Sequence, residues 1–126
     1  MSTEHISTPD APRPAGAYSQ AVVADGFLWT AGFGPQDPLT GEVPDGVAAQ
    51  TAQVLKNVRA TLATRGLDLS DVVKVTTHLE HLRRDFAEYD TVCREEFTEP
   101  YPARTTVGSD LFDILVEVDV VARLRD

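Results

Sequence analysis

Cysteine is almost missing from this sequence, because Cys93 is the only one among 126 residues. A single cysteine cannot form an internal disulfide, which is typical of proteins kept in a reducing compartment. Long hydrophobic runs are also missing, and the polar N-terminus has no apolar core of the kind that a secretory signal needs. These absences predict a cytoplasmic protein without a membrane partner.

Basic residues are few. The chain has 11 lysines and arginines against 20 aspartates and glutamates, so its net charge is -9. Nucleic acids and anionic membranes bind basic surfaces, so neither is expected as a partner. A small anionic ligand is still compatible with this charge, because one well-placed arginine creates a local positive site.

Internal repeats, low-complexity tracts and linker-like segments are absent as well, so residues 1–126 are expected to form a single domain. Several β-rich runs lie within it, and the first two meet at Asp25-Gly26, a dipeptide that favours a hairpin turn. In a later run, the odd-numbered residues from Val73 to Leu79 share one strand face. The last two runs are most simply an antiparallel pair. The predicted strands lie within residues 18–26, 27–34, 71–80, 103–108 and 114–124.

Apolar residues recur at helical spacing in two segments. The first extends from Val47 to Leu62, with Asp45 placed to cap its start and Gly66 to end it. The second extends from Phe86 to Phe97 and includes Cys93, which is expected to be a small buried hydrophobe; Asp85 is placed to cap it. The order β-β-α-β-α-β-β predicts an α+β fold with both helices on one face of the sheet.

The last strand has two different faces. Every second residue from Ile114 to Ala122 is apolar, which suits contact with the helices. The opposite face mixes apolar and charged side chains, which fits neither a dry core nor open water. An interface that carries a binding site would suit it. The members of this mixed face are Leu115, Glu117, Asp119, Val121 and Arg123.

Arg104 introduces a charge into the neighbouring strand. If residues 103–108 pair with the last strand, Arg104 and Thr106 share the face of Glu117 and Asp119. Two interpretations are open at this point. The charges can form salt bridges that hold the strands in register. Alternatively, Arg104 binds a substrate carboxylate through two parallel hydrogen bonds while Glu117 holds a water molecule.

Several stretches together resemble the RidA/YjgF family of reactive intermediate (enamine/imine) deaminases, from about Pro12 to Arg123. They are GAYSQAVVADG, DPLTGEVPDGVAAQTAQVLKNVRATL, LSDVVKVTTHL, DFAEYDTVCREEF and PART followed by VEVDVVA. The resemblance implies a chorismate-mutase-like fold, with a mixed sheet, and a homotrimeric barrel with pockets between subunits. It also implies hydrolysis of 2-enamine and 2-imino acids to 2-keto acids and ammonia, with no cofactor and no metal.

The resemblance assigns catalytic roles to three residues. Arg104 would anchor the substrate carboxylate, Glu117 would handle the attacking water, and Tyr18 would line the pocket. A frequent cysteine is replaced by Thr106, and an asparagine of the second helix by Asp90; both positions are expected to contact substrate.

The family's usual Ser-Gly-Gln strand motif reads Ala31-Gly32-Phe33 in this chain. These three residues are also expected to line the pocket. Loss of the serine hydroxyl and the apolar wall that Phe33 can offer predict a preference for imino acids with larger apolar side chains. The alternative is that Phe33 packs in the subunit core and never meets substrate.

Three functions from different classes stay open on this basis. One is a broad imine deaminase, the second a specialised relative acting on a bulkier pathway intermediate, and the third a non-catalytic ligand-binding trimer. RNA cleavage, another label given to this family, fits poorly with a net charge of -9.

His78 and His81 straddle a strand end, so a surface turn is a better interpretation of them than a metal site.

Overall fold

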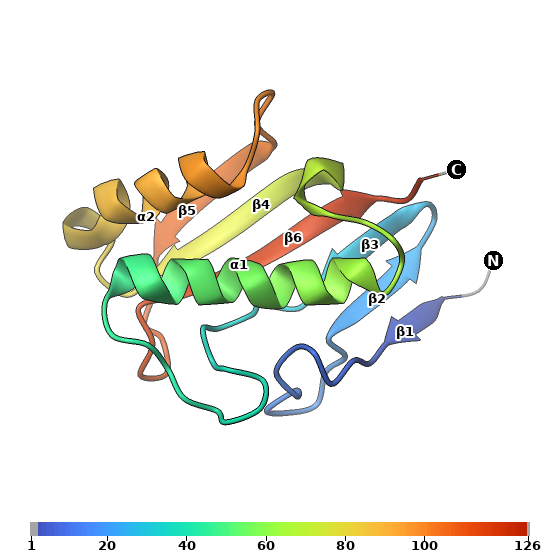
Figure 1. Cartoon of the computed structure of the whole chain (residues 1–126), viewed down its shortest axis with the longest axis horizontal. Helices are drawn as coiled ribbons and strands as arrows, with labels where there is room; N and C mark the ends of the chain where they lie inside the picture. Colours follow the sequence, from blue (N-terminus) through green and yellow to red (C-terminus); the bar gives the residue numbers. More distant parts are fainter. Residues whose placement is uncertain (1–2, 126) are drawn as a thin grey trace.

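The computed structural model describes residues 3–125. Within them, two helices cover one face of a six-stranded mixed sheet with the order β1-β2-β3-β6-β4-β5 (Figure 1). The α+β architecture predicted from the sequence is confirmed. The strands are β1 (Glu4–Ile6), β2 (Ala21–Ala24), β3 (Phe27–Thr30), β4 (Val72–Leu79), β5 (Ala103–Gly108) and β6 (Val116–Arg123); the helices are α1 (Val47–Ala63), α2 (Leu82–Glu96) and the short 3-10 turn η1 (Leu69–Asp71).

The β2–β3 hairpin turns at Asp25-Gly26, as predicted. Both residues have positive φ angles, 52° for Asp25 and 85° for Gly26, which is the backbone geometry that a tight two-residue hairpin requires. Strand β1 was not predicted from the sequence. It pairs antiparallel with β2, with Ile6 opposite Ala21, and three residues are too few to reveal a period of two.

The predicted antiparallel pair of the last two strands is wrong. Strand β4 lies between β5 and β6, parallel to β5 and antiparallel to β6. Helix α2 connects β4 to β5 and returns the chain to the same end of the sheet, so β5 enters in the same direction as β4.

Helix α1 begins at Val47, one residue later than it would if Asp45 were its N-cap. Gly46, with a φ of 85°, is the N-cap, and no side chain caps the helix, so the prediction for Asp45 is wrong. Gly66 is confirmed as the stop signal. Its φ is 69° and its N–H donates to the carbonyl oxygen of Ala63, while the N–H of Leu67 reaches back to Leu62.

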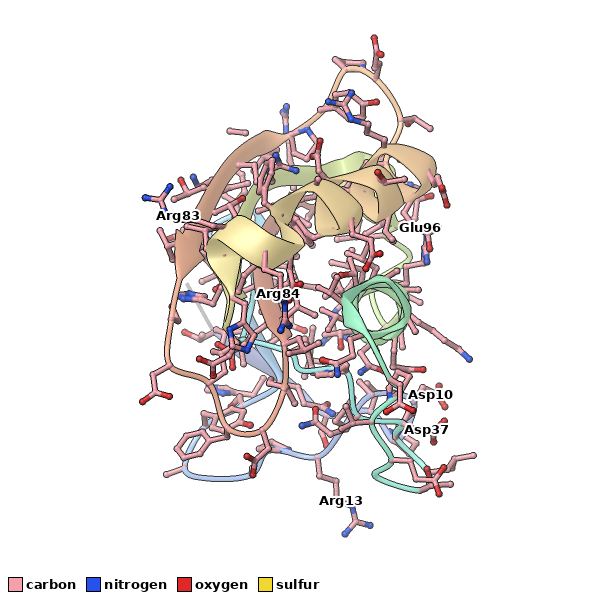
Figure 2. All side chains as sticks on the ribbon, turned by 90° about the vertical axis from the view of Figure 1, so that its left-hand side faces the viewer. Asp10, Arg13, Asp37, Arg83, Arg84 and Glu96 are labelled. Carbon is pink, nitrogen blue, oxygen red and sulfur yellow. The ribbon has the colours of Figure 1, made fainter. Side chains whose placement is uncertain are left out.

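Helix α2 lies beside α1 on the same face of the sheet (Figure 2, where α1 is seen end on). An ion pair of 2.8 Å between Arg59 of α1 and Glu96 of α2 links the two helices. The N-cap of α2 is His81, and Asp85 lies one turn inside the helix, paired with Arg84, so the predicted cap at Asp85 is wrong. No described helix is long and apolar enough to cross a membrane.

The core lies between the helices and the sheet. The apolar face of β6 is confirmed, since Val116, Val118, Val120 and Ala122 are at most 1% exposed. On β4 the alternation slips: a bulge between residues 72 and 74 turns Val72 inward and leaves Val73 43% exposed, which corrects the prediction for Val73.

The other side of the sheet, called here the open face, carries no helix. Glu117 and Asp119 of β6 lie on it, next to His78 and Thr76 of β4, and all four are partly exposed. Trp29 of β3 is 50% exposed. The mixed polar and apolar character expected for this face is therefore present.

Candidate functional site

Arg104 and Glu117 lie on opposite faces of the sheet, so the prediction that they share one face is wrong. Arg104 stands opposite Val75, whose side chain is only 2% exposed and points towards the helices. Glu117 stands opposite His78 and lies between Val116 and Val118, whose side chains point towards the helices. Glu117 therefore lies on the open face. Because β4 separates the two strands, it decides which face each residue takes.

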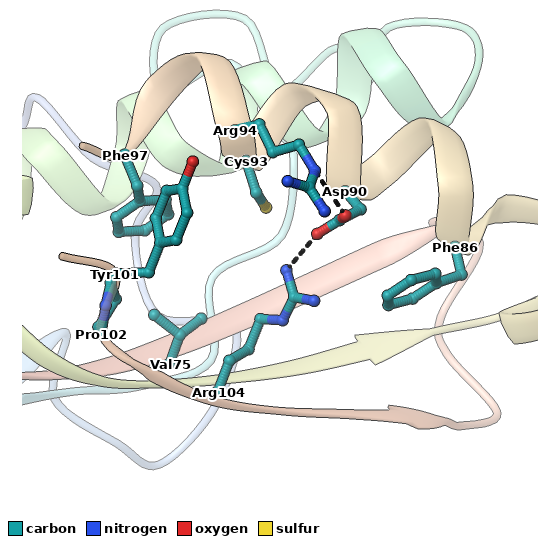
Figure 3. A pocket seen from close by; sticks show the side chains of 9 residues that line it. All are labelled: Val75, Phe86, Asp90, Cys93, Arg94, Phe97, Tyr101, Pro102 and Arg104. Carbon is teal, nitrogen blue, oxygen red and sulfur yellow. Dashed lines mark hydrogen bonds and ion pairs between the residues drawn. The ribbon is translucent and has the colours of Figure 1, made fainter. Parts of the chain in front are cut away.

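On the helix side, Arg104 makes a salt bridge with Asp90 of α2. The Nη1 of Arg104 donates to Oδ1 of Asp90 at 2.7 Å, and the Nε of Arg94 donates to Oδ2 of the same carboxylate at 3.0 Å (Figure 3). Arg104, Asp90 and Arg94 are called the arginine cluster below. The cluster joins β5 to α2 and holds a carboxylate between two guanidinium groups.

The charges of the arginine cluster stabilise each other. The hydrogen bond from Arg104 holds the pKa of the Asp90 carboxyl below its ordinary value, and Arg94 adds to this effect. Partial burial acts to lower the pKa of Arg104, whereas the hydrogen bond to Asp90 and the negative charge of that carboxylate act together to raise it, and the net shift is upwards. The cluster therefore carries two positive charges and one negative charge at neutral pH.

Aromatic rings fix the Arg104 guanidinium further. Its carbon lies 5.4 Å from the ring centre of Phe86 and 5.5 Å from that of Tyr89, within the range of cation–π attraction. The Tyr89 hydroxyl is hydrogen-bonded to the buried Thr77 hydroxyl, and burial raises the pKa of Tyr89. The guanidinium is thus held in one orientation before any ligand arrives.

A cavity of about 430 Å³ opens beside Arg104, between α2 and the segment that leads into β5. Phe97, Tyr101 and Pro102 form apolar walls, and Val75 lies on the sheet side (Figure 3). Cys93 also contributes to the lining. It is buried, as predicted, and burial raises the pKa of its thiol, so it resembles a small hydrophobe rather than a nucleophile.

Thr106 lies two residues beyond Arg104 on the same side of β5, opposite Thr77. Its hydroxyl oxygen is buried and has no hydrogen-bond partner within residues 3–125. Buried hydroxyls are rarely left unpaired, so this atom is an exception among the described residues.

On the open face, Glu117 lies directly over Gly32. A β-carbon at residue 32 would come within 2.7 Å of Oε2 of Glu117, so a side chain there cannot coexist with this position of the carboxylate. Asp119, two residues along β6, is also partly exposed. Burial raises the pKa of its carboxyl, while the nearby His78 and Lys74 act in the opposite direction.

The remaining predicted site residues are spread along the segments around β2 and β3. Tyr18 lies in a bend before β2 and is 49% exposed, and its hydroxyl accepts a hydrogen bond of 3.0 Å from the N–H of Ala15. Ala31 is half-buried and its N–H donates to the carbonyl oxygen of Gln20. Phe33 is 4% exposed and packs in the core, which agrees with the alternative stated for it.

The structure thus divides the predicted site into two groups. Arg104, Asp90 and Thr106 lie on the helix side, whereas Glu117 and Gly32 lie on the open face. Sequence reasoning missed the role of Arg94 and the aromatic lining of the cavity. The four-residue spacing of Asp90 and Arg94 on a helix was a usable signal for the first. Within residues 3–125, no cluster of three metal-ligating side chains is found.

Comparisons with known proteins agree over nearly the whole chain. A family model described as "Endoribonuclease L-PSP" matches residues 8–124. A RutC family protein of Pyrococcus horikoshii is 44% identical over 122 residues, which cover 94% of this chain and 96% of the relative. The 2-iminobutanoate/2-iminopropanoate deaminase of Escherichia coli is 38% identical over 125 residues, covering 95% of this chain and 97% of the enzyme.

Solved structures are similar to the same extent. RidA from the Antarctic bacterium Psychrobacter sp. superimposes with a TM-score of 0.91 at 35% identity, covering 96% of this chain and 99% of that one. The YjgF gene product of Escherichia coli gives a TM-score of 0.90 at 37% identity, covering 97% and 99%. The order of the elements, the PART segment and these similarities lead to one conclusion: the chain belongs to the RidA/YjgF family.

Proposed function

We propose that this protein hydrolyses 2-imino acids and their enamine tautomers to 2-keto acids and ammonia, in sites that two copies of the chain share within a trimer. The observation that carries the proposal is the state of Arg104. Its guanidinium is held by Asp90 at the edge of a cavity with apolar walls and has N–H groups left to bind a carboxylate.

Arg104 is suited to anchor a substrate carboxylate. Within residues 3–125 its hydrogen bond to Asp90 uses Nη1, so the edge formed by Nε and Nη2 can donate two parallel bonds to a ligand. Asp90 and the two aromatic rings hold that edge in a fixed direction, which reduces the entropy lost on binding. Arg94 offsets the charge of Asp90, so the cluster still attracts an anion.

Glu117 is the candidate base, but it cannot act on a substrate bound to Arg104 of its own chain. The two residues lie on opposite faces of the sheet, with β4 between their strands. A second copy that turns its open face towards the Arg104 side of the first would bring the two groups together. Three copies related by a closed threefold axis make three such contacts and bury each open face once.

The proposed reaction needs no group beyond these side chains and a water molecule. The water oxygen attacks C2 of the C=N bond while the Glu117 carboxylate takes a proton from it. The Glu117 carboxyl returns that proton to nitrogen, which gives a neutral tetrahedral carbinolamine. The C–N bond then breaks as the hydroxyl oxygen forms the new carbonyl, and the hydroxyl proton passes through the Glu117 carboxylate to nitrogen, which leaves as ammonia. The products are one 2-keto acid and one ammonia for each imino acid and water consumed. Tyr18, Ala31 and Gly32 are proposed to line the pocket on the Glu117 side.

The relative named a 2-iminobutanoate/2-iminopropanoate deaminase supports this reaction class. The family description "Endoribonuclease L-PSP" suggests RNA as an alternative substrate. A net charge of -9 favours the small carboxylate substrate, because RNA binding needs a basic surface that tracks the phosphate backbone.

Replacing Arg104 tests the proposal. We expect Arg104→Lys and Arg104→Ala each to lower kcat/KM by about a hundredfold or more, because lysine cannot reproduce the bidentate geometry. Imino acids released by an amino-acid oxidase, with semicarbazide trapping the remainder, give the rate. Arg83→Ala, which removes an exposed arginine of α2, is the matched control and should behave like wild type.

Sedimentation of all four proteins must accompany these rates, so that loss of assembly is not mistaken for loss of binding. The proposal requires a trimer in each case. Wild-type rates in Arg104→Ala would contradict it, and so would full activity in a stable monomer.

A further inference from the structure

The cavity beside Arg104 has a polar end and an apolar body. Arg104 and Arg94 lie at the polar end, and Phe97, Tyr101 and Val75 form the apolar part (Figure 3). Its volume of about 430 Å³ falls within the range of pockets that hold small molecules. Such a combination suits a ligand with one anionic group and one apolar substituent.

The position of Arg104 ties this cavity to the proposed reaction. Arg104 lies between Phe86 on one side and the Tyr101 wall on the other, and all three contribute to the same lining. A carboxylate bound to the free edge of the guanidinium would leave the rest of the ligand next to the apolar walls. The cavity is therefore adjacent to the reacting carbon of an acid held there.

Phe33 does not provide the apolar wall that the sequence suggested for larger substrates. It is 4% exposed and contacts the core. Tyr101, by contrast, is 47% exposed and faces the cavity, so it can contact a ligand without disturbing the core. Tyr101 therefore takes the place of Phe33 as the candidate wall for larger side chains.

We propose that the cavity holds the apolar side chain of the 2-imino acid or 2-keto acid whose carboxylate binds Arg104, and that Tyr101 and Phe97 set the preference for its size. The inference rests on the proposed function for the reaction that follows binding. The substrate class is thereby narrowed to imino acids with branched aliphatic or aromatic side chains, such as those derived from leucine and phenylalanine. The imine derived from alanine would leave the cavity empty.

Binding of 2-keto acids tests this inference without requiring turnover. We expect 4-methyl-2-oxopentanoate to bind the wild-type trimer about tenfold to two hundredfold more tightly than pyruvate, because extra methylene groups in an apolar pocket increase affinity by about this factor. Isothermal titration calorimetry measures both affinities. Tyr101→Ala should reduce this ratio by about tenfold, and Tyr101→Phe should retain it, because the ring rather than the hydroxyl forms the wall.

Two further variants make the test specific. Cys93→Leu adds volume to the cavity lining and should also reduce the ratio, whereas Phe112→Ala removes a ring that is 96% exposed elsewhere and should leave it unchanged. Equal affinity for the two keto acids, or a ratio that Tyr101→Ala does not alter, would overturn the inference. Either result would follow if a side chain of another subunit filled the cavity.

The same measurements separate this inference from the proposed function. If the cavity does not hold the ligand's side chain but the proposed function is right, Arg104→Ala still weakens the binding of both keto acids. The wild-type protein then still hydrolyses imino acids. Failure of the proposed function has the opposite signature: the preference for 4-methyl-2-oxopentanoate persists, but no imino acid is hydrolysed faster than in the absence of protein.

Discussion

Gly32 and Glu117 illustrate how single residues shape the open face. The Glu117 carboxylate occupies the space that a side chain at residue 32 would need, with Cδ only 2.9 Å from the ideal β-carbon position. Glycine is therefore required here by close approach, not by backbone conformation. The absence of a side chain at residue 32 leaves room for the Glu117 carboxylate next to the backbone of this segment.

At this scale we expect Gly32→Ala to lower kcat by about tenfold to a hundredfold, because the methyl group displaces the carboxylate from its working position. The thermal midpoint should change little, since the atoms that must move are the far end of a partly exposed side chain. Steady-state rates and a thermal melt measure the two quantities. An unchanged kcat would show that the position of Glu117 over Gly32 has no part in the reaction.

Asn57 of helix α1 fixes the segment that follows Gly32. It is 1% exposed on α1, and its Nδ2 donates to the carbonyl oxygens of Gly34 at 3.0 Å and Gln36 at 2.9 Å. These bonds attach the segment that follows Gly32 to the helix layer. The position of Gly32 under Glu117 thus depends on α1 as well as on the sheet.

The prediction at the element scale is that Asn57→Ala lowers the free energy of unfolding by about 2–3 kcal/mol, because two buried carbonyl groups lose their donor. Gln53→Ala is the matched control. It removes only the partner that donates to Oδ1 of Asn57, and should cost about 1 kcal/mol or less. Denaturant titration at one fixed protein concentration gives both values. Equal losses in the two variants would contradict this role of Asn57.

Some structural elements could be predicted from the sequence and others could not. The stripe of α1, the Asp25-Gly26 turn and the alternation on β6 were predictable, because each depends on residues close together in the chain. The neighbour of β5 was not, since strand pairing is set by contacts far apart in sequence. That one error moved Arg104 to the wrong face. The cavity could not be predicted either, because it depends on how the segment before β5 packs against α2.

At the scale of the whole molecule, the separation of the candidate site into two groups is the main consequence of the fold. A single copy carries an anchored arginine on one side of the sheet and a carboxylate over a glycine on the other. The open face combines Trp29, which is 50% exposed, with the partly exposed carboxylates of Glu117 and Asp119. Assembly would cover this face and complete the site in the same step.

Mixing two inactive variants tests this account most directly. Arg104→Ala and Glu117→Gln should each be inactive alone as trimers, since each lacks one group at every site. When equal amounts are unfolded and refolded together, about one interface in four of a random trimer pairs an intact Arg104 with an intact Glu117. We predict that the mixture regains about a quarter of the wild-type activity towards 2-imino acids. A mixture that exchanges subunits but stays no more active than its separate components would contradict a site built from two copies.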